Sequence, residues 1–202
     1  MSSFFYCIKL RTHTDTDHIG DLEEVVKRFK IKEICVSQGA LTKTSFVKRL
    51  RFLKGPVRTL KVGDKLPMMG SNLQVLYPNK IGDGGNNDSL VLYGKLLETS
   101  FLFTGDLEKE GEEELMASYP NLKVNVLKAG HHGSKGSSSE AFLDQLEPSL
   151  ALVSAGVNNR FKHPNDETLE RFQERHIKVL RTDQDGAIRF KGWFKLSSET
   201  VR

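Results

Sequence analysis

The sequence contains little cysteine and no long hydrophobic run. Only two cysteines occur among its 202 residues, Cys7 and Cys35, and they do not form a CxxC pair. This disfavours a disulfide framework or a cysteine-based zinc site, and we expect both positions to be buried thiols in apolar strands. No apolar stretch approaches the length of a membrane span, and residues 1–10 lack the basic leader and cleavage site of a signal peptide. We therefore expect a chain that is soluble by its own sequence.

Several motifs of nucleotide and nucleophile chemistry are also missing. The chain has no Walker loop, no dinucleotide-binding fingerprint and no GxSxG elbow. An EF-hand does not fit, because Ile19 and Val26 would stand at positions that need oxygen ligands. P-loop enzymes, nicotinamide dehydrogenases, serine hydrolases of the elbow type and EF-hand proteins are therefore excluded.

The composition is that of an ordinary globular domain. Apolar residues make up 38% and charged residues 28% of the chain, and the formal net charge is +4. The positive charge mildly favours a polyanionic partner. Its densest stretch, residues 43–58, is compatible either with a nucleic-acid patch or with a solvated helix face.

Hydrophobic periodicity and turn residues predict a single α/β domain over residues 1–202, with helices covering sheet faces. Polar clusters fall where predicted strands end, at residues 13–18, 104–106, 130–134 and 154–163. The predicted helices are 21–30, 44–54, 107–118, 138–146 and 166–175. The predicted strands are 4–10, 32–36, 57–61, 73–77, 89–93, 100–104, 123–128, 150–154, 178–181 and 186–191.

The first polar cluster has the composition of a metal site. His13, Asp15, Asp17 and His18 lie within six residues, after a predicted strand. Imidazole and carboxylate together suit Zn²⁺, Mn²⁺ or Fe²⁺. Their spacing places His13 and Asp15 side by side on an extended loop, while Asp17 and His18 point elsewhere and can serve a second ion. We favour this interpretation over a chance polar loop.

The later clusters add further candidates. Asp106 follows an apolar strand and can bridge two metal ions, although Gly-Asp is also an ordinary turn. His131 and His132 lie between glycines, which let the backbone approach a ligand closely. One of the two is expected to bind metal, and the other to face the substrate together with Ser134. His163 in the last cluster is either a phosphate contact or a surface histidine.

Taken together, the motifs resemble those of the metallo-β-lactamase superfamily in order and spacing. One branch is closer still. The segments Phe103-Thr-Gly-Asp106, Lys128-Ala-Gly-His-His-Gly-Ser134 and Asn159-Arg-Phe-Lys-His163-Pro164 resemble the C-terminal domain of the ComEC family, the bacterial DNA-internalisation competence proteins. The resemblance covers nearly the whole chain from about residue 8.

The resemblance implies a four-layer αββα fold with two divalent metal ions, zinc or manganese, that activate water to hydrolyse an ester or phosphodiester. The implied substrate is DNA, single-stranded DNA in particular, during uptake for transformation. Full-length relatives carry a membrane channel domain, so the resemblance also implies association with the outer face of the cell membrane. No transmembrane segment occurs in this chain itself.

Three departures from the family pattern bear on these expectations. Asp15 stands where the superfamily usually has histidine, which favours Mn²⁺ over Zn²⁺. No histidine occurs between His18 and His131, and the place of the third-motif histidine falls to the loop of Asn87 and Asp88. Only twelve residues precede His13, so we expect a partial domain that lacks the N-terminal strands of the fold.

The motifs and the resemblance together define an expected site. We expect one metal ion to be held by His13, Asp15 and His131, the second by Asp17 and His18, and Asp106 to bridge them. The expected catalytic residues are Asp17, His132 and His163. The expected substrate-binding residues are Asn87, Asp88, Ser134 and Asn159.

Two alternatives remain open. The chain is an inactive fragment or binding module of the same fold, as the missing strands and the missing third-motif histidine would favour. Or it is a hydrolase of a different substrate, such as a small phosphodiester, phosphorylcholine or a lactone.

Overall fold

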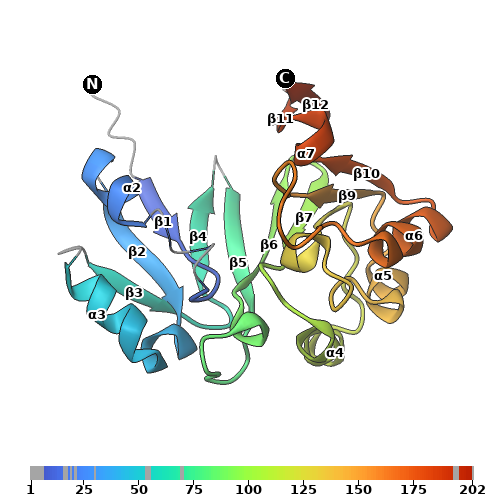
Figure 1. Cartoon of the computed structure of the whole chain (residues 1–202). Helices are drawn as coiled ribbons and strands as arrows, with labels where there is room; N and C mark the ends of the chain where they lie inside the picture. The colour runs from blue at the N-terminus through green and yellow to red at the C-terminus, as the bar shows by residue number, and fades with distance from the viewer. Residues whose placement is uncertain are drawn as a thin grey trace.

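The structure is a computed structural model of the chain (Figure 1). It describes residues 7–15, 18, 20, 22–29, 31–52, 56–68, 71–192 and 196–201. Among these residues, no helix combines the length and the apolar character that crossing a bilayer requires.

The strands of the described residues form three sheets. A parallel sheet has the order β1-β2-β3, with β1 (Cys7–Leu10), β2 (Ile31–Ser37) and β3 (Val57–Leu60). A hairpin consists of β11 (Ala187–Lys191) and β12 (Ser197–Val201). The largest sheet has the order β10-β9-β8-β7-β6-β5-β4. Its strands are β4 (Lys65–Met68), β5 (Ser71–Tyr77), β6 (Val91–Leu96), β7 (Thr99–Phe103), β8 (Val126–Lys128), β9 (Leu150–Val153) and β10 (Lys178–Arg181).

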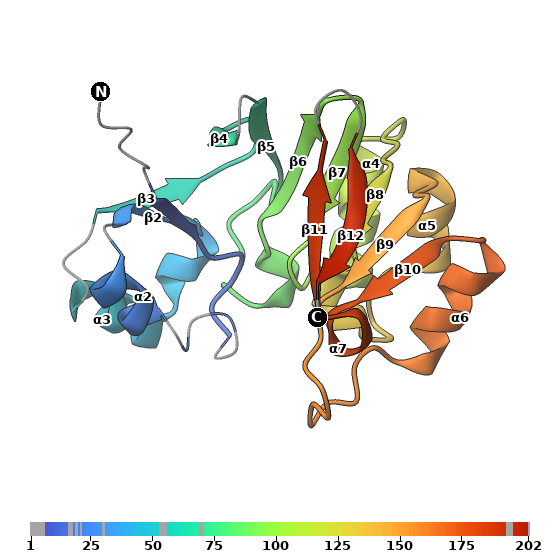
Figure 2. The same cartoon turned by 90° about the horizontal axis from the view of Figure 1, so that it is seen from above.

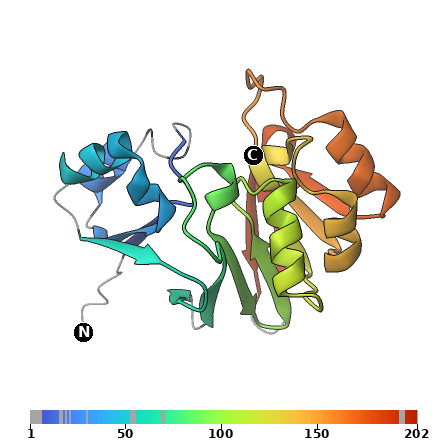
Figure 3. The ribbon, with the colours of Figure 1, turned by 90° about the horizontal axis from the view of Figure 1, so that it is seen from below.

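Helices flank the two larger sheets on their outer sides (Figure 1). The helices beside the parallel sheet are α2 (Leu22–Arg28) and α3 (Thr44–Phe52). The helices beside the seven-stranded sheet are α4 (Lys109–Ser118), α5 (Glu140–Leu146) and α6 (Asp166–Glu174). A short helix, α7 (Thr182–Asp185), connects β10 to the hairpin. Figure 3 shows α4 lying along the seven-stranded sheet.

Alternation along the strands explains why the sheets stack. In β2, Ile34 and Val36 pack with Leu22 of α2 and Phe46 of α3. The intervening Cys35 points to the opposite face, because successive side chains of a strand alternate. There it packs against residues of both sheets, namely Leu60, Leu66, Val75, Leu90 and Leu92. The parallel sheet is therefore buried on both faces.

The seven-stranded sheet follows the same rule. Val91 and Leu102 pack with Leu115 of α4 and Phe142 of α5. Their neighbours Leu92 and Phe103 belong to the cluster between the two sheets. The layers therefore run helix, sheet, sheet, helix, which confirms the αββα order predicted from the resemblance.

The direction of the strands decides where the loops meet. β7, β8, β9 and β10 are parallel neighbours, so their carboxyl ends lie at one edge of the sheet. The polar clusters that were predicted at strand ends follow β7, β8 and β9 at this edge. Figure 2 shows the loop after β9 projecting beyond α7. A functional site built from strand-end loops is therefore possible.

Most predicted elements agree with the structure to within a few residues, with three corrections. Residues 65–68 were not predicted as a strand but form the edge strand β4, where Pro67 is tolerated because an edge leaves one side unpaired. The strand β12 was not predicted. The short helix α7 was not predicted either. At the start of α5, the Ser139 side chain makes no capping bond, and Glu112 accepts hydrogen bonds from the backbone N–H groups of Ser138 and Ser139.

Candidate metal centre

Three loops that are distant in sequence are joined by backbone hydrogen bonds. The N–H of His131, after β8, donates to the carbonyl of Gly105, after β7, at 3.1 Å. The carbonyl of Thr12, after β1, accepts from the N–H of Leu90 at 3.0 Å. Ser89, which precedes Leu90, accepts a hydrogen bond at Oγ from the backbone N–H of Asp106 at 3.0 Å, so the loops after β1, β7 and β8 are tied together.

Local backbone conformation turns the histidines inward. His131 and His132 have φ angles of 44° and 56°, in the left-handed region that residues with a side chain rarely adopt. Gly105 has a φ of 57°, and a Cβ at this position would lie 2.9 Å from the Cβ of Thr12. Such strained conformations concentrate at functional sites, where the surrounding structure holds them in place.

Asp106 lies at the centre of the histidine cluster. Its Oδ2 atom is 3.2 Å from Nε2 of His18, 3.7 Å from that of His13, and 3.8 Å from those of His131 and His132. The carboxylate is almost fully buried. One carboxylate oxygen is therefore approached by four imidazole nitrogens from two loops, an arrangement that suits a carboxylate bridging two cations.

Further distances show how closely the candidate ligand atoms are spaced. Nε2 of His18 lies 3.3 Å from Nε2 of His132, and Nε2 of His13 lies 3.9 Å from Oδ2 of Asp15. Ligand atoms bound at about 2.0–2.1 Å in a tetrahedral shell are separated by roughly 3.3 Å. His13, His18 and Asp106 also offer ligand atoms that all lie within 4.8 Å of one another. These spacings fit a shared coordination site.

The electrostatics of the cluster keep Asp106 ionised. Burial alone would raise the pKa of this carboxyl, but the hydrogen bond and charge of His18 and the charges of His13 and His132 outweigh burial and lower the pKa to about 2. The Oδ1 atom is buried and has no hydrogen-bond partner among the described residues. An ionised, buried oxygen without a donor is in keeping with a cation ligand.

Two of the histidines have their second nitrogen held by an acceptor. Nδ1 of His132 lies 2.7 Å from the carbonyl oxygen of Ser154, and Nδ1 of His131 lies 3.2 Å from Oε1 of Glu108. A carbonyl oxygen can only accept, so Nδ1 of His132 donates to it, and Nε2 is the nitrogen that the ring can offer to a cation. Metal-binding histidines in proteins are oriented in this way.

Hydroxyl groups orient the rings of His13 and His18. Oγ1 of Thr12 lies 3.1 Å from Nδ1 of His13 and 3.3 Å from Nδ1 of His18. Oγ of Ser89 lies 3.3 Å from Nδ1 of His13 and accepts a hydrogen bond from the backbone N–H of Asp106. The chemistry of the donor set, four imidazoles around the buried carboxylate of Asp106 with Asp15 beside His13, therefore fits divalent metal ions.

The predicted metal ligands largely come together. His13, His18, Asp106 and His131 belong to the cluster, and Asp15 approaches His13 with a half-exposed side chain. Asp17 lies outside the described residues. His132, predicted to contact substrate, reaches Asp106 as closely as His131 does, so the geometry adds it to the candidate ligands.

The predicted substrate-binding loop of Asn87 and Asp88 makes contacts of a structural kind. Asp88 is buried, and its carboxylate accepts hydrogen bonds from the Ser37 hydroxyl at 2.8 Å and the Gly82 N–H at 3.1 Å. Oδ1 of Asn87 accepts from the backbone N–H of Glu108 at 2.9 Å. These contacts order the loop that carries Ser89 beneath His13.

The remaining predicted contacts lie on the loops after β8 and β9. Ser134 accepts a hydrogen bond from the backbone N–H of Gly136, and its carbonyl accepts from the Thr168 hydroxyl. Asn159 binds the backbone of its own loop at His163. The ring of His163 lies 5.6 Å from that of His131, measured between centroids.

A cavity of about 370 Å³ adjoins the centre. His18, Asp106 and His132 form its polar side, and Leu73, Leu92 and Phe103 are among its apolar residues. The side chain of Lys128 also lines it, and burial lowers the pKa of this ammonium while the charge of Asp106 raises it. The cavity can therefore admit a substrate group to the candidate ligands.

Sequence reasoning missed Thr12, Ser89, Glu108 and Ser154, which orient the histidines. Thr12 adjoins the first motif, and Glu108 follows the Asp106 motif by two residues. Nearness to a motif is the only sequence signal that could have found them, because hydroxyl and carboxylate side chains are common on loops.

The chain belongs to the metallo-β-lactamase superfamily, whose family model matches residues 10–157. It is 42% identical over 184 residues to ComE operon protein 3 of Bacillus subtilis (strain 168), covering 89% of this chain and 24% of the relative. It is 33% identical over 183 residues to competence protein ComA of Neisseria gonorrhoeae, with the same coverage. The chain thus spans about a quarter of the length of these relatives.

The fold likeness extends to solved structures. CmlA, a diiron β-hydroxylase from Streptomyces venezuelae, matches with a TM-score of 0.56 and 15% sequence identity, covering 86% of this chain and 43% of CmlA. At this identity the likeness establishes the fold alone. The family model and the two competence proteins, by contrast, confirm the predicted superfamily and the predicted likeness to competence proteins.

Proposed function

We propose that the chain is a metal-dependent phosphodiesterase domain that cleaves DNA during uptake by competent bacteria. The observation that carries the proposal is the approach of four imidazole nitrogens to the single Oδ2 atom of Asp106, at 3.2–3.8 Å. The likeness to proteins named for competence supports DNA as the substrate.

We propose that the candidate ligands hold two divalent ions. His18, His132 and Asp106 would hold one divalent ion, and His13, Asp15 and Asp106 the other. His131 lies within reach of Asp106. Asp17, predicted to bind the same ion as His18, is retained as a further candidate ligand. Divalent ions at this centre would supply a lowered pKa for a water molecule and charge neutralisation for a phosphodiester. Zinc and manganese both suit this mixture of nitrogen and oxygen donors.

The residues of the chain would preorganise this chemistry. Thr12 and Ser89 fix the rings of His13 and His18, while Ser154 and Glu108 fix those of His132 and His131. The apolar walls of the adjoining cavity reduce access of bulk water. Orientation by such outer contacts typically changes metal affinity or activity by 10–100-fold.

The proposal includes the place of action. By resemblance to the competence proteins, the domain would act at the outer face of the cell membrane beside a channel domain, on single-stranded DNA. His163 and Ser134 remain proposed contacts of the substrate. The side chains of Asn87, Asp88 and Asn159 are engaged in ordering their loops, and we propose that they act on the site through that order.

The test is cleavage of a 5′-labelled single strand by the purified chain with Mn²⁺ or Zn²⁺. The parent should cleave it and Asp106→Asn should not, while His176→Asn, at an exposed histidine outside the cluster, should cleave like the parent. Hydrolysis of bis-p-nitrophenyl phosphate without cleavage of DNA would favour a small phosphodiester as substrate. Bound metal without any hydrolysis would favour a binding module.

A further inference from the structure

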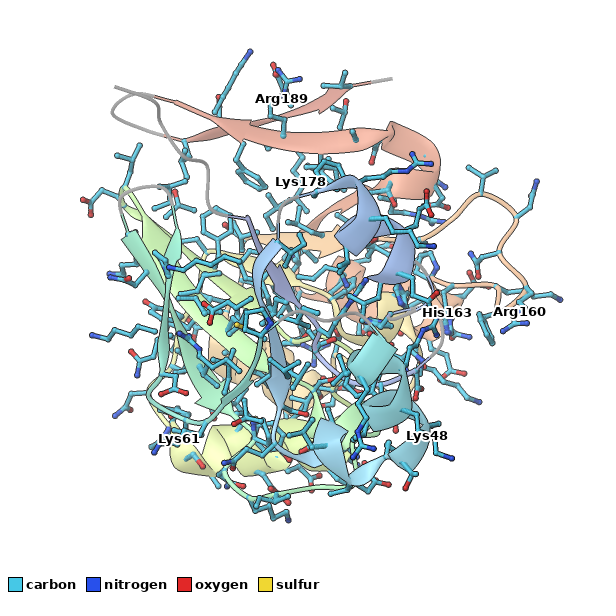
Figure 4. The ribbon with its side chains drawn as sticks, turned by 90° about the vertical axis from the view of Figure 1, so that its left-hand side faces the viewer. Lys48, Lys61, Arg160, His163, Lys178 and Arg189 are labelled. Atoms are coloured by element: carbon cyan, nitrogen blue, oxygen red, sulfur yellow. The ribbon has the colours of Figure 1, made fainter. Side chains whose placement is uncertain are left out.

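The loop after β9 presents an exposed aromatic side chain. Phe161 is 56% exposed, although burying such a side chain would stabilise a protein by about 1.5–3 kcal/mol. The guanidinium carbon of Arg160 lies 4.5 Å from the centroid of the Phe161 ring. Lys162, the next residue in the chain, is also exposed. Figure 4 shows Arg160 on the outer part of this loop and His163 nearer the body of the protein. An aromatic ring flanked by two cations is thus displayed to solvent.

The loop holds this ring in a defined position. The amide of Asn159 donates to the carbonyls of Gly156 at 3.0 Å and His163 at 2.7 Å. Its Oδ1 atom accepts from the backbone N–H of His163 at 2.9 Å. Because one side chain closes the loop through three hydrogen bonds, Phe161 is presented at little further cost in conformational entropy.

The exposed ring is connected to the metal centre. The ring of Phe161 is nearly parallel to that of His163, at 17° and 5.9 Å between centroids, and the ring of His163 packs against His131. A cavity of about 220 Å³ is lined by Phe161 and His163 together with His132, which also lines the cavity at Asp106. Nδ1 of His163 is buried and has no hydrogen-bond partner in the described part of the chain.

We propose that this cavity binds one base of single-stranded nucleic acid, stacked on Phe161, beside the phosphodiester at the metal centre. The position of the phosphodiester rests on the proposed function. Stacking of a base on an aromatic side chain contributes about 1–3 kcal/mol and tolerates any sequence. Arg160 and Lys162 would contact the adjacent phosphates. A duplex is disfavoured, because its bases are already stacked on each other.

The experiment measures binding rather than cleavage. Fluorescence anisotropy compares a labelled ten-nucleotide thymidine strand with a strand of equal length and charge that lacks the bases, both with phosphorothioate linkages that resist hydrolysis. The whole purified chain should bind the strand with bases about 5- to 100-fold more tightly. Phe161→Ala should bind both strands equally, and Phe161→Trp should keep the preference.

Two variants control for charge and for the loop itself. Val157→Ala removes another exposed apolar side chain from the same loop and should behave like the parent. Lys162→Gln should weaken the binding of both strands by the same factor, because a phosphate contact does not depend on the base. Equal binding of the two strands by the parent, no binding of either, or a preference retained in Phe161→Ala would overturn the proposal. An intact preference together with no cleavage of unmodified DNA would support the base site and contradict the hydrolase.

Discussion

Nε2 of His18 and Nε2 of His132 lie 3.3 Å apart although 114 residues separate them in the chain. Nδ1 of His132 is occupied by the Ser154 carbonyl, so the two Nε2 atoms face each other across the site. Two nitrogens at this distance without an ion or proton between them would repel through their lone pairs. The two rings therefore share either a proton or a cation that both of them bind.

Removing either member of this pair should remove metal. We expect His18→Ala and His132→Ala to lower the affinity for Mn²⁺ or Zn²⁺ by more than about 100-fold, beyond the effect of an outer contact. Isothermal titration of the metal-free chain measures this. His176→Asn is the control, and an affinity in His132→Ala equal to that of the control would assign His132 to the substrate instead.

Thr12 should matter through the two rings that it orients. Its Oγ1 atom lies 3.1 Å and 3.3 Å from the Nδ1 atoms of His13 and His18. Thr12→Val keeps the shape and removes the hydroxyl, so metal affinity should fall by about 10- to 100-fold, while Thr12→Ser should retain it. A Thr12→Ser variant as weak as Thr12→Val would show that the hydroxyl is not the cause.

Among the candidate metal ligands, Glu108 should act on His131. Its Oε1 atom lies 3.2 Å from Nδ1 of that ring and 3.1 Å from the amide nitrogen of Asn86. Glu108→Gln keeps an oxygen acceptor without the charge, so we expect metal affinity to fall by about 10-fold at constant stability. Thermal unfolding of the metal-free variant separates the effects: a large fall in Tm without metal would mean that Glu108 supports the fold instead.

A buried acid outside the site gives a prediction on pH. Burial raises the pKa of Glu112 above the ordinary value of 4.5, although the N–H groups of Ser139 and Ser138 lower it. With a folded pKa above the unfolded one, ionisation disfavours the folded state. The contribution of Glu112 to the free energy of unfolding is thus greatest below pH 4.5 and declines as pH rises through the folded pKa.

The matched variant is Glu112→Gln, which cannot ionise. Urea unfolding between pH 4.5 and 7.5 should give a free energy that falls with pH more steeply in the parent than in the variant. Glu112→Ala should lose about 1–3 kcal/mol at every pH, because two buried N–H groups lose their acceptor. Parallel pH profiles for the parent and Glu112→Gln would refute this account of Glu112.

Much of the fold was predictable because the burial pattern is local. The alternation of Ile34, Cys35 and Val36 reflects a strand with helices on one side and a second sheet on the other. β4 was missed because Pro67 and neighbouring turn residues resemble a loop, and only pairing with β5 makes a strand there. β12 was missed because Ser197–Val201 is polar and depends on its partner β11.

The residues of the candidate site were likewise predictable only in part. His13, His18, Asp106 and His131 could be named from sequence, because imidazoles and carboxylates at strand ends carry a chemical signal of their own. The roles of Thr12 and Ser154 could not, because a hydroxyl or a backbone carbonyl gains its role only from what the fold places beside it. The inclusion of His132 among the ligands likewise depends on its backbone conformation.

The central claim is that Asp106 joins two metal ions in one centre. Elemental analysis of the purified chain, after saturation with Mn²⁺ or Zn²⁺ and removal of the excess, tests it most directly. The account predicts two divalent ions per chain in the parent and fewer in Asp106→Asn. A parent chain that retains no metal, or an Asp106→Asn chain that retains as much as the parent, would contradict it.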